Sequence, residues 1–311
     1  MGAITDVPGI RVGHTQKSDA GWLSGVTVVL PPPGTVGSVD VQGGGPATHE
    51  TDALDPTTLV SGVDAVVLTG GSAYGLVSAS GAQRWCEENN RGFAVPGGVV
   101  PIVPAAAIFD LGRGGDFSAR PTAEMGYAAT AAAAGEKDGH DVGRGNVGAG
   151  TGAVIARTFK GGVGTASVTL DNGVVVGAIA VVNALGLPFD QTKPEVPAPV
   201  KAATTTNTTL VVVATNGFLD VAECKRTASA SQAGIARALN PSHTLADGDT
   251  VFCLSTQAVA LDRSDEAARQ VSLITLQSAA AAVVRLAILD GVASAQAVST
   301  PAADYGVFGA Q

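Results

Sequence analysis

The run of residues 208–215, which reads TTLVVVAT, constrains the fold more than any other part of the sequence. β-Branched and apolar residues in an unbroken run of this length predict a buried strand. The run follows directly on a polar, threonine-rich stretch, residues 203–207. The chain on either side must therefore supply the neighbouring strands of a sheet and the helices that cover it.

Further strands and helices are predicted on both sides of this run from β-branched runs and from apolar residues at helical spacing. The predicted strands are residues 25–30, 65–69, 153–157, 166–170, 174–182 and 250–256, and the predicted helices are residues 72–88, 123–136, 219–238 and 264–289. Asp171-Asn172-Gly173 predicts a tight hairpin turn, because Asn-Gly tolerates positive φ. Asp290-Gly291 predicts the end of the last helix.

This order of elements predicts an α+β fold with antiparallel-rich sheets covered by helices, in one domain spanning residues 1–311. Charged residues make up only 14% of the chain and glycine occurs 41 times, which is typical of small side chains packed between close layers. Only residues 187–206, rich in proline and threonine, have the composition of an exposed, flexible connection.

The composition also limits which binding partners and which cellular compartment are expected. The formal net charge is −9 with Lys and Arg scattered, so neither nucleic acid nor a membrane surface is an expected partner. The first residues lack the basic region and apolar core of a leader, and apolar stretches are interrupted before they reach membrane-spanning length. Cys86, Cys224 and Cys253 are isolated, which predicts buried thiols. We expect a cytoplasmic protein.

Thr208 is the candidate nucleophile. A threonine hydroxyl at the start of a strand can attack the carbonyl group before it, and cleavage between Asn207 and Thr208 gives Thr208 a free α-amine. Such an amine can activate a hydroxyl without a histidine, and its pKa near neutrality lets it take up and return a proton. The sequence therefore predicts self-cleavage into residues 1–207 and 208–311. The alternative is an ordinary junction between a loop and a strand.

Asn183, Asp247 and Asp249 are candidate partners of this hydroxyl. Asn183 follows the apolar run 174–182, and an amide at the end of a strand suits an oxyanion, although it can equally cap a turn. Asp247 and Asp249 occupy alternate positions just before the predicted strand 250–256, so their carboxylates face the same side. They could orient the α-ammonium group of Thr208 or bind a cationic end of a substrate. The alternatives are an exposed turn or a calcium-binding loop.

Four glycine-rich patches are candidate walls of an active site: residues 42–46, 70–75, 144–152 and 160–165. The second patch joins a predicted strand to a predicted helix, where backbone N–H groups bind anions, so Gly71 and Tyr74 are candidates for contact with an oxyanion or substrate. The patch lacks the Lys-Ser/Thr of a P-loop, and turns between packed elements explain each patch equally well. The histidines show no ligand spacing, so no metal and no cofactor is expected.

Six motifs, in order, resemble the L-aminopeptidase/D-esterase family, which includes β-aminopeptidases and the nylon-oligomer (6-aminohexanoate) hydrolases. They are residues 6–14 (DVPGIRVGH), the segment from GGGP at 43–46 to ETD at 50–52, residues 70–75, residues 145–152, the Asn207-Thr208 pair with VVVAT after it, and residues 247–252 (DGDTVF). The match covers essentially the whole chain. The Asn-Thr pair and the two aspartates look most like the nylon-hydrolase branch.

The resemblance implies a four-layer αββα sandwich, similar to that of N-terminal-nucleophile hydrolases but differently connected. It implies self-cleavage between Asn207 and Thr208, two chains that stay together, and a homo-oligomer, often a homotetramer. By motif position, Thr208 matches the nucleophile, Asn183 the asparagine at the oxyanion, and Asp247 and Asp249 the acidic pair.

The chain differs from the family pattern in two places. Where several members carry a tyrosine, this chain has Phe109, which cannot donate a hydrogen bond. A lysine used by the nylon-oligomer hydrolases falls at or near Arg157 or Lys160, and the sequence does not decide between the two.

We therefore expect an enzyme that hydrolyses a small peptide, amide or ester as an aminopeptidase or a nylon-type amidase. Acyl transfer of the ornithine acetyltransferase type is the alternative reaction, and an uncut, non-catalytic binding protein is the alternative class. The sequence does not choose among L-peptide, β-peptide, D-ester and synthetic amide substrates.

Overall fold

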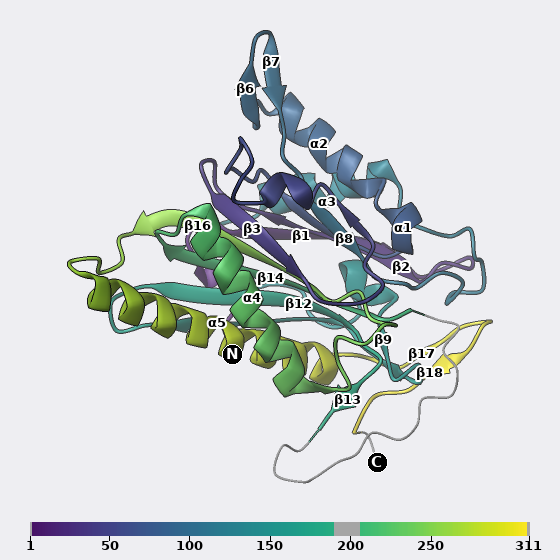
Figure 1. The fold of residues 1–311 in the computed structure, drawn as a ribbon. Helices are drawn as coiled ribbons and strands as arrows, with labels where there is room; N and C mark the ends of the chain where they lie inside the picture. Colours follow the sequence, from purple (N-terminus) through teal and green to yellow (C-terminus); the bar gives the residue numbers. More distant parts are fainter. Residues whose placement is uncertain (1, 190–205, 310–311) are drawn as a thin grey trace.

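Two five-stranded sheets lie face to face at the centre of the molecule (Figure 1). The structure is a computed structural model, and it describes residues 2–189 and 206–309. The first sheet has the order β1-β2-β5-β8-β4, and all its neighbouring strands are antiparallel except β5 and β8. Its strands are β1 (Arg11–Lys17), β2 (Ser24–Leu30), β5 (Val66–Thr69), β8 (Ala105–Ala107) and β4 (Thr48–His49).

The second sheet has the order β11-β12-β14-β16-β3. Its central strand, β14, pairs antiparallel with β12 and parallel with β16, and all of its residues are buried. The strands are β11 (Val163–Thr169), β12 (Val175–Asn183), β14 (Thr208–Gly217), β16 (Thr250–Val259) and β3 (Val36–Val41).

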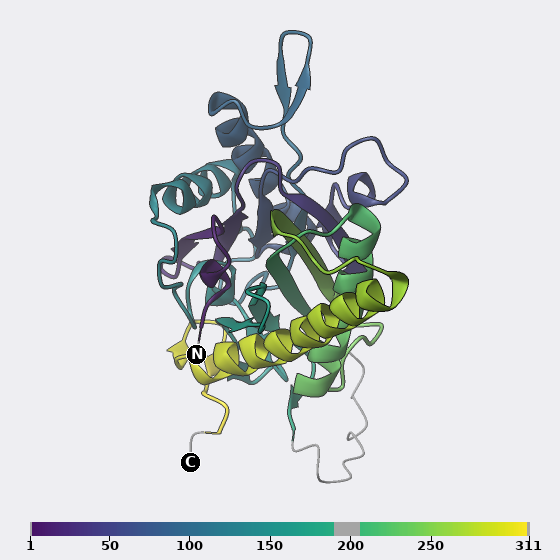
Figure 2. The ribbon, with the colours of Figure 1, turned by 90° about the vertical axis from the view of Figure 1, so that its left-hand side faces the viewer.

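Helices cover the outer face of each sheet, so the fold has four layers, αββα (Figures 1 and 2). α2 and α3 lie on the first sheet, and α4 and α5 lie on the second. A side chain at the N-terminus caps α3, α4 and α5, and at α4 this is a capping box formed by Asp220 and Glu223. The helices are α1 (Ser72–Gly75), α2 (Ser78–Glu88), α3 (Ala123–Gly135), α4 (Val221–Ala238) and α5 (Glu266–Ala293).

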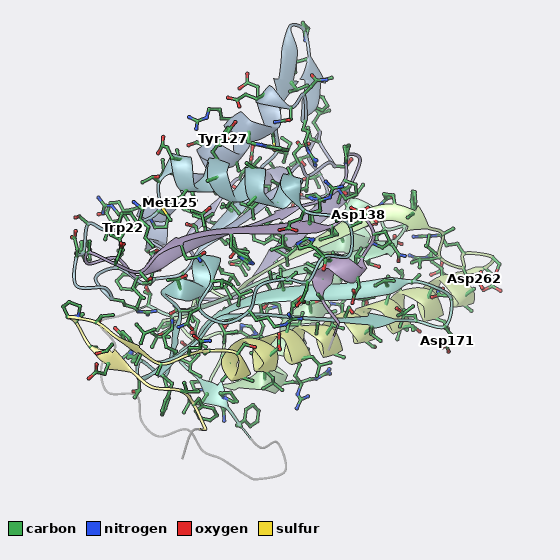
Figure 3. The ribbon with its side chains drawn as sticks, turned by 180° about the vertical axis from the view of Figure 1, so that it is seen from behind. Trp22, Met125, Tyr127, Asp138, Asp171 and Asp262 are labelled. Carbon is green, nitrogen blue, oxygen red and sulfur yellow. The ribbon has the colours of Figure 1, made fainter. Side chains whose placement is uncertain are left out.

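Short elements complete the chain. A hairpin of β6 (Phe93–Val95) and β7 (Gly98–Val100) projects from the body beyond α2 (Figures 1 and 2). The turn at Asp171, between β11 and β12, and the segment at Asp262, ahead of α5, lie at the same end of the molecule (Figure 3). The remaining elements are η1 (Ile4–Asp6), η2 (Asp52–Leu54), η3 (Gly148–Thr151), β9 (Val154–Ile155), β10 (Phe159–Lys160), β13 (Leu187–Pro188), β15 (Leu239–Asn240), β17 (Val298–Ser299) and β18 (Asp304–Tyr305).

The apolar core consists of three layers that the sheets separate. Alternate residues of β14 belong to two of them, because successive side chains of a strand point to opposite faces. Leu210 and Val212 pack between the two sheets, whereas Val211 and Val213 pack under α4 and α5. The third layer lies between the first sheet and its helices. The central position of β14 explains why its sequence is an unbroken β-branched run.

The α+β fold with four layers is confirmed, and most predicted elements are present. Three details differ. The predicted helix 72–88 is two helices, because the bonds from Ala79 and Ser80 N–H to Leu76 and Val77 carbonyls are of the tighter 3₁₀ type. The predicted strand 153–157 ends at Ile155, since the next two residues have positive φ.

The third difference is the end of the last helix: α5 continues through Gly291 to Ala293, so the predicted end at Asp290-Gly291 is wrong. Among the strands of the two main sheets, β1, β3, β4 and β8 were not predicted, and neither was the hairpin of β6 and β7. Most of the predicted flexible connection, residues 190–205, lies outside the described residues.

By length and composition, α5 is apolar enough to cross a membrane, with a mean hydropathy of 1.8 over its most apolar window. In the fold it packs against α4 and against β11 and β12, and it forms part of the core under the second sheet. This packing explains the apolar residues of its buried face, which is 39% of that window, whereas Val271 and Ile274 are exposed.

Candidate active site

Thr208 is the first residue of β14, at the centre of the second sheet. Its antiparallel register partner is Asn183, the last residue of β12, so two predicted site residues lie directly opposite each other. Thr208 is buried, with only 3% of its surface exposed. Its hydroxyl donates a hydrogen bond to the carbonyl oxygen of Asn207, which belongs to the peptide bond that the hydroxyl would attack.

The peptide bond between Asn207 and Thr208 lies in an extension of the sheet. The Asn207 N–H donates to the carbonyl oxygen of Ala246 at 2.6 Å, and the Asn207 carbonyl oxygen accepts from the Gly248 N–H at 2.8 Å. These two bonds form a parallel bridge between Asn207 and Asp247 that continues the pairing of β14 with β16. The carbonyl group therefore has a fixed direction, and its oxygen has a backbone donor at the distance typical of an oxyanion site.

Asp249 holds the backbone just after the candidate nucleophile. One of its carboxylate oxygens accepts from the Thr209 N–H at 2.7 Å, and the other accepts from the His243 N–H at 3.0 Å. That second oxygen also lies 2.9 Å from Nδ1 of the His243 ring. Burial is the largest single effect and disfavours the charged ring, but the hydrogen bond to Asp249, the charge of Asp249 and smaller contributions together outweigh it, so the pKa of His243 is raised. His243 was not singled out in the sequence, where nothing but its closeness to Asp249 indicates it.

Asp247 lies on the other side of Gly248 and is equally buried. One of its carboxylate oxygens accepts from the N–H and the hydroxyl of Thr244, at 3.0 and 2.6 Å. Burial and the nearby charge of Asp249 raise the pKa of Asp247. The two predicted aspartates thus lie close together beside Thr208, on either side of the residue that donates to the Asn207 carbonyl.

Asn183 is held in one orientation by donors to its side-chain oxygen. Nη1 of Arg113 lies 2.5 Å from that oxygen, and the Val154 N–H lies 3.1 Å from it. The Nδ2 of Asn183 makes only a long bond, 3.5 Å, to the carbonyl oxygen of Phe109. The amide therefore presents an N–H₂ group that is weakly engaged, which suits a donor to an oxyanion.

Near Asn183 lie three ionisable side chains, of which Asp110 and Lys160 are buried and Arg113 is half-buried. Arg113 also donates to the carbonyl oxygen of Gly152 at 2.5 Å. Lys160 is fully buried, and its Nζ donates to the carbonyl oxygens of Thr151 and Ala153 at 2.8 and 2.6 Å. Burial, together with the charge of Arg113, lowers the pKa of Lys160 to about 7. Burial raises the pKa of the third group, Asp110.

Of the two candidates for the lysine of related hydrolases, Lys160 lies buried in this cluster and Arg157 is exposed. Arg113 and Asp110 were missed in the sequence, since both lie in a loop with no motif. Their neighbour Phe109 is half-buried and contributes its backbone carbonyl rather than its ring.

The glycine patch at 70–75 has a different role from the expected one. The Gly71 N–H donates to Asp110 at 2.6 Å, so it is used inside the protein and not offered to an oxyanion. Gly71 has φ 78°, which explains the glycine. Tyr74 is 56% exposed, and the Arg120 guanidinium lies 3.9 Å from its ring centroid. The structure brings neither residue into hydrogen-bond contact with Thr208 among the described residues.

The described residues show no cluster of three or more metal-ligating side chains. Five surface hollows, with volumes of about 270 to 520 Å³, are lined by other residues than Thr208, Asn183 and the two aspartates. In the uncut chain Thr208 is thus buried, and none of these five hollows reaches it.

Comparisons with known proteins place this geometry in context. The family model for peptidase family S58 matches residues 2–304. An uncharacterized aminopeptidase of Mycobacterium tuberculosis is 48% identical, over 96% of both chains. The 6-aminohexanoate-oligomer endohydrolase of an Agromyces species is 28% identical, over 92% of this chain and 84% of its own.

A solved structure, the L-aminopeptidase D-Ala-esterase/amidase of Ochrobactrum anthropi, has the same fold. It superposes with a TM-score of 0.74 at 22% identity, over 98% of this chain and 90% of its own. Its description places it among variants of the Ntn-hydrolase fold. Nylon-oligomer hydrolases are thus among the relatives, at lower identity than the mycobacterial aminopeptidase.

Proposed function

The chain belongs to peptidase family S58, and from this premise we propose that it is a self-processing hydrolase of amide bonds with Thr208 as its nucleophile. One observation carries the assignment of Thr208. Its hydroxyl is hydrogen bonded to the carbonyl of its own upstream peptide bond, directly opposite Asn183 on the neighbouring strand. A hydroxyl in that position is placed to attack this carbonyl first, and a substrate carbonyl after the cut.

In the proposed first step, Thr208 cuts the bond to Asn207 and gains a free α-amine. In turnover, the amine accepts the proton from the hydroxyl as Oγ attacks the substrate carbonyl, and it returns the proton to the leaving nitrogen. The Nδ2 of Asn183 stabilises the oxyanion. Water then attacks the acyl-enzyme, and its proton follows the same route.

We assign supporting roles to the charged residues around this centre. Asp249 fixes the start of β14 through the Thr209 N–H. Asp247, close to Asp249, adds negative charge beside the ammonium form of the Thr208 amine. Lys160 is the counterpart of the lysine in related hydrolases, because it is buried behind Asn183 whereas Arg157 is exposed.

The proposed substrates are peptides or short amide oligomers with a free amino end. Relatives of this chain carry the names aminopeptidase and 6-aminohexanoate-oligomer endohydrolase, which share amide-bond cleavage. Two neighbouring aspartates suit a cationic amino group better than a carboxylate. Release of the free acid rather than transfer to an added amine separates this activity from acyl transfer.

We also propose that the cut chains stay together and assemble into a homotetramer in the cytoplasm. β14 and β16, from residues 208–311, pair with β12 and β3 from residues 1–207, so the second sheet spans the cut. The projecting β6–β7 hairpin exposes Phe93, Val95 and Val100, which is favourable for subunit contact. The three cysteines are free and buried, which fits a reducing compartment.

Thr208→Val and Thr208→Ser form the decisive pair of variants. Valine keeps the shape of the buried threonine without its hydroxyl, so we expect one uncut chain and no hydrolysis. Serine keeps the hydroxyl, so we expect two chains and measurable activity. Denaturing gel electrophoresis and release of free amine from a panel of dipeptides and 6-aminohexanoate oligomers check both. A Thr208→Val protein that is still cut at Asn207 contradicts the proposal.

A further inference from the structure

We propose that the N–H of Gly248 is the oxyanion donor of the self-cleavage step, and that Gly43 and Gly44 are needed to hold it in place. The inference rests on the proposed function, because it concerns the peptide bond that Thr208 attacks. It assigns a role to Gly248, a motif residue for which the resemblance implies none, and it gives the Gly-Gly-Gly run a chemical purpose.

The geometry of the donor fits the charge that develops. When Oγ of Thr208 bonds to the carbonyl carbon of Asn207, the carbonyl oxygen becomes negatively charged. The Gly248 N–H lies 2.8 Å from that oxygen in the uncut chain. A donor preorganised at this distance costs no rearrangement as the charge forms.

The cleavage balances with water as the only co-reactant. The bond from Oγ to the Asn207 carbonyl carbon forms, and the bond from that carbon to the Thr208 nitrogen breaks. The proton of the hydroxyl ends on this nitrogen, which becomes the free amine, and an ester joins the two residues. Water then hydrolyses the ester to the Asn207 carboxylate and the Thr208 hydroxyl.

A side chain at position 248 would crowd the nucleophile. A Cβ atom on Gly248 would lie 2.8 Å from Oγ1 of Thr208 and 3.0 Å from the carbonyl oxygen of Gly45. The backbone of the donor residue therefore approaches the nucleophile as closely as it does because it has no side chain. The same absence brings its N–H to the carbonyl oxygen of Asn207.

The segment 42–45 is hydrogen bonded to the loop that carries Gly248. This segment donates backbone hydrogen bonds along the loop: Gln42 and Gly43 to the Asp249 carbonyl at 3.0 and 3.3 Å, Gly44 to the Thr244 carbonyl at 3.1 Å, and Gly45 to the Asp247 carbonyl at 2.8 Å. Two of the accepting carbonyls belong to the residues on either side of Gly248. The segment thus fixes the direction of the Gly248 N–H.

The three glycines of this segment differ in the room around them. A Cβ at Gly43 would lie 2.3 Å from the carbonyl oxygen of Asp247, and one at Gly44 would lie 2.6 Å from Cα of Leu245. A Cβ at Gly45 meets nothing closer than 3.5 Å. None of the three has positive φ, so only the contacts of the added Cβ determine whether alanine can replace each glycine. Alanine at position 43 must displace the donor loop, whereas alanine at position 45 fits.

The first experiment removes the donor alone. Cell-free translation of the full chain with glycolic acid in place of Gly248 replaces the N–H by an ester oxygen and changes no side chain. Glycine decoded from the same codon is the control. We expect self-cleavage, followed over time on a denaturing gel, to slow by about 10²-fold or more. Cleavage at the control rate overturns the proposal.

The second experiment uses a matched pair of variants to test whether the segment 42–45 holds the Gly248 N–H in place. Gly43→Ala is expected to slow self-cleavage by at least tenfold, and Gly45→Ala to stay within twofold of the unaltered chain. Both are also made with Thr208→Val, so that the melting temperature of the uncut chain reports folding separately. Equal cleavage rates in folded Gly43→Ala and Gly45→Ala chains contradict the role of the segment.

Failure of this inference and failure of the proposed function give different results. If Thr208→Val is still cut, the proposed function is wrong. If Thr208→Val is uncut and the glycolic acid chain cuts normally, only the role of Gly248 is wrong.

Discussion

A half-buried arginine determines the orientation of the amide at the candidate site. Arg113 donates to the side-chain oxygen of Asn183, and a reversed amide would bring two donor groups together. The nearby charge of Asp110 offsets part of the cost of burying Arg113. Asp110 in turn is tied to the Gly71 N–H, so the turn at 70–75 supports the site indirectly.

Replacing Arg113 with methionine tests this positioning role. We expect kcat to fall by about 10²-fold with KM little changed, because the Asn183 amide loses its fixed direction. The melting temperature should fall as well, because the buried carboxylate of Asp110 loses a compensating charge.

The double variant Arg113→Met/Asp110→Asn separates the two effects. It should recover the melting temperature and not kcat. Steady-state kinetics and thermal unfolding measure both quantities, and a double variant with full kcat would show that Arg113 acts only on stability.

Among the site residues, those at the ends of predicted strands could be predicted from the sequence, and those in loops could not. Thr208 and Asn183 end or begin apolar runs, and Asp247 and Asp249 precede one, so their positions could be predicted. Arg113 reaches Asn183 through a tertiary contact between segments 70 residues apart, and His243 reaches Asp249 from an irregular loop six residues away. No periodicity or local motif indicates such contacts.

Among the elements, α5 and β11 approach each other at two glycines. A Cβ on Gly164 of β11 would lie 2.0 Å from the nitrogen of Gly291 in α5 and 2.1 Å from the carbonyl oxygen of Ala287. Gly291 therefore lies inside the helix, where the lack of a side chain lets α5 pack closely against β11. The sequence indicated a helix end there, because a glycine after an aspartate is also typical of a C-terminus.

Alanine at position 164 should push α5 away from the sheet. In a Thr208→Val background, which we expect to remain one chain, Gly164→Ala is expected to lower the free energy of unfolding by about 3 kcal/mol. Gly135→Ala, at the open end of α3, is the matched control and should raise it by about 0.5 kcal/mol. Urea denaturation measures both, and equal stabilities would mean that the contact relaxes without cost.

Elements buried on both faces were the easiest to predict. β12, β14 and β16 have long apolar runs, and so do the helices that cover them. β1 and β3 carry polar residues such as His14 and Asp40 and were missed, because a half-polar strand without strict alternation resembles a loop. The arrangement of the strands in two sheets came from the family resemblance, and the residues indicated only one pairing, the hairpin of β11 and β12 at Asp171-Asn172-Gly173.

In the whole molecule, the second sheet joins the two parts of the chain on either side of the proposed cut. β14 lies between β12 and β16, and β16 pairs with β3 at the edge. The layer between the sheets also contains residues from both parts, such as Val29 and Phe252. Residues 1–207 contain the whole first sheet, but the second sheet and the two core layers that line it need residues from both parts.

We therefore expect the cut protein to behave as one unit. Residues 1–207 and 208–311 should elute together in size-exclusion chromatography and separate only when the protein unfolds. Unfolding of the cut protein should become concentration-dependent, unlike that of the Thr208→Val chain. Elution of either part alone under native conditions would disagree with the shared sheet.

The burial of Thr208 also affects whether the newly made chain can attack other proteins of the cell. A hydroxyl enclosed in the middle of a sheet, with its nitrogen still locked in an amide, cannot attack other polypeptides. We therefore expect the uncut chain to be latent and hydrolytic activity to arise only after the strands around Thr208 have paired and the chain has been cut.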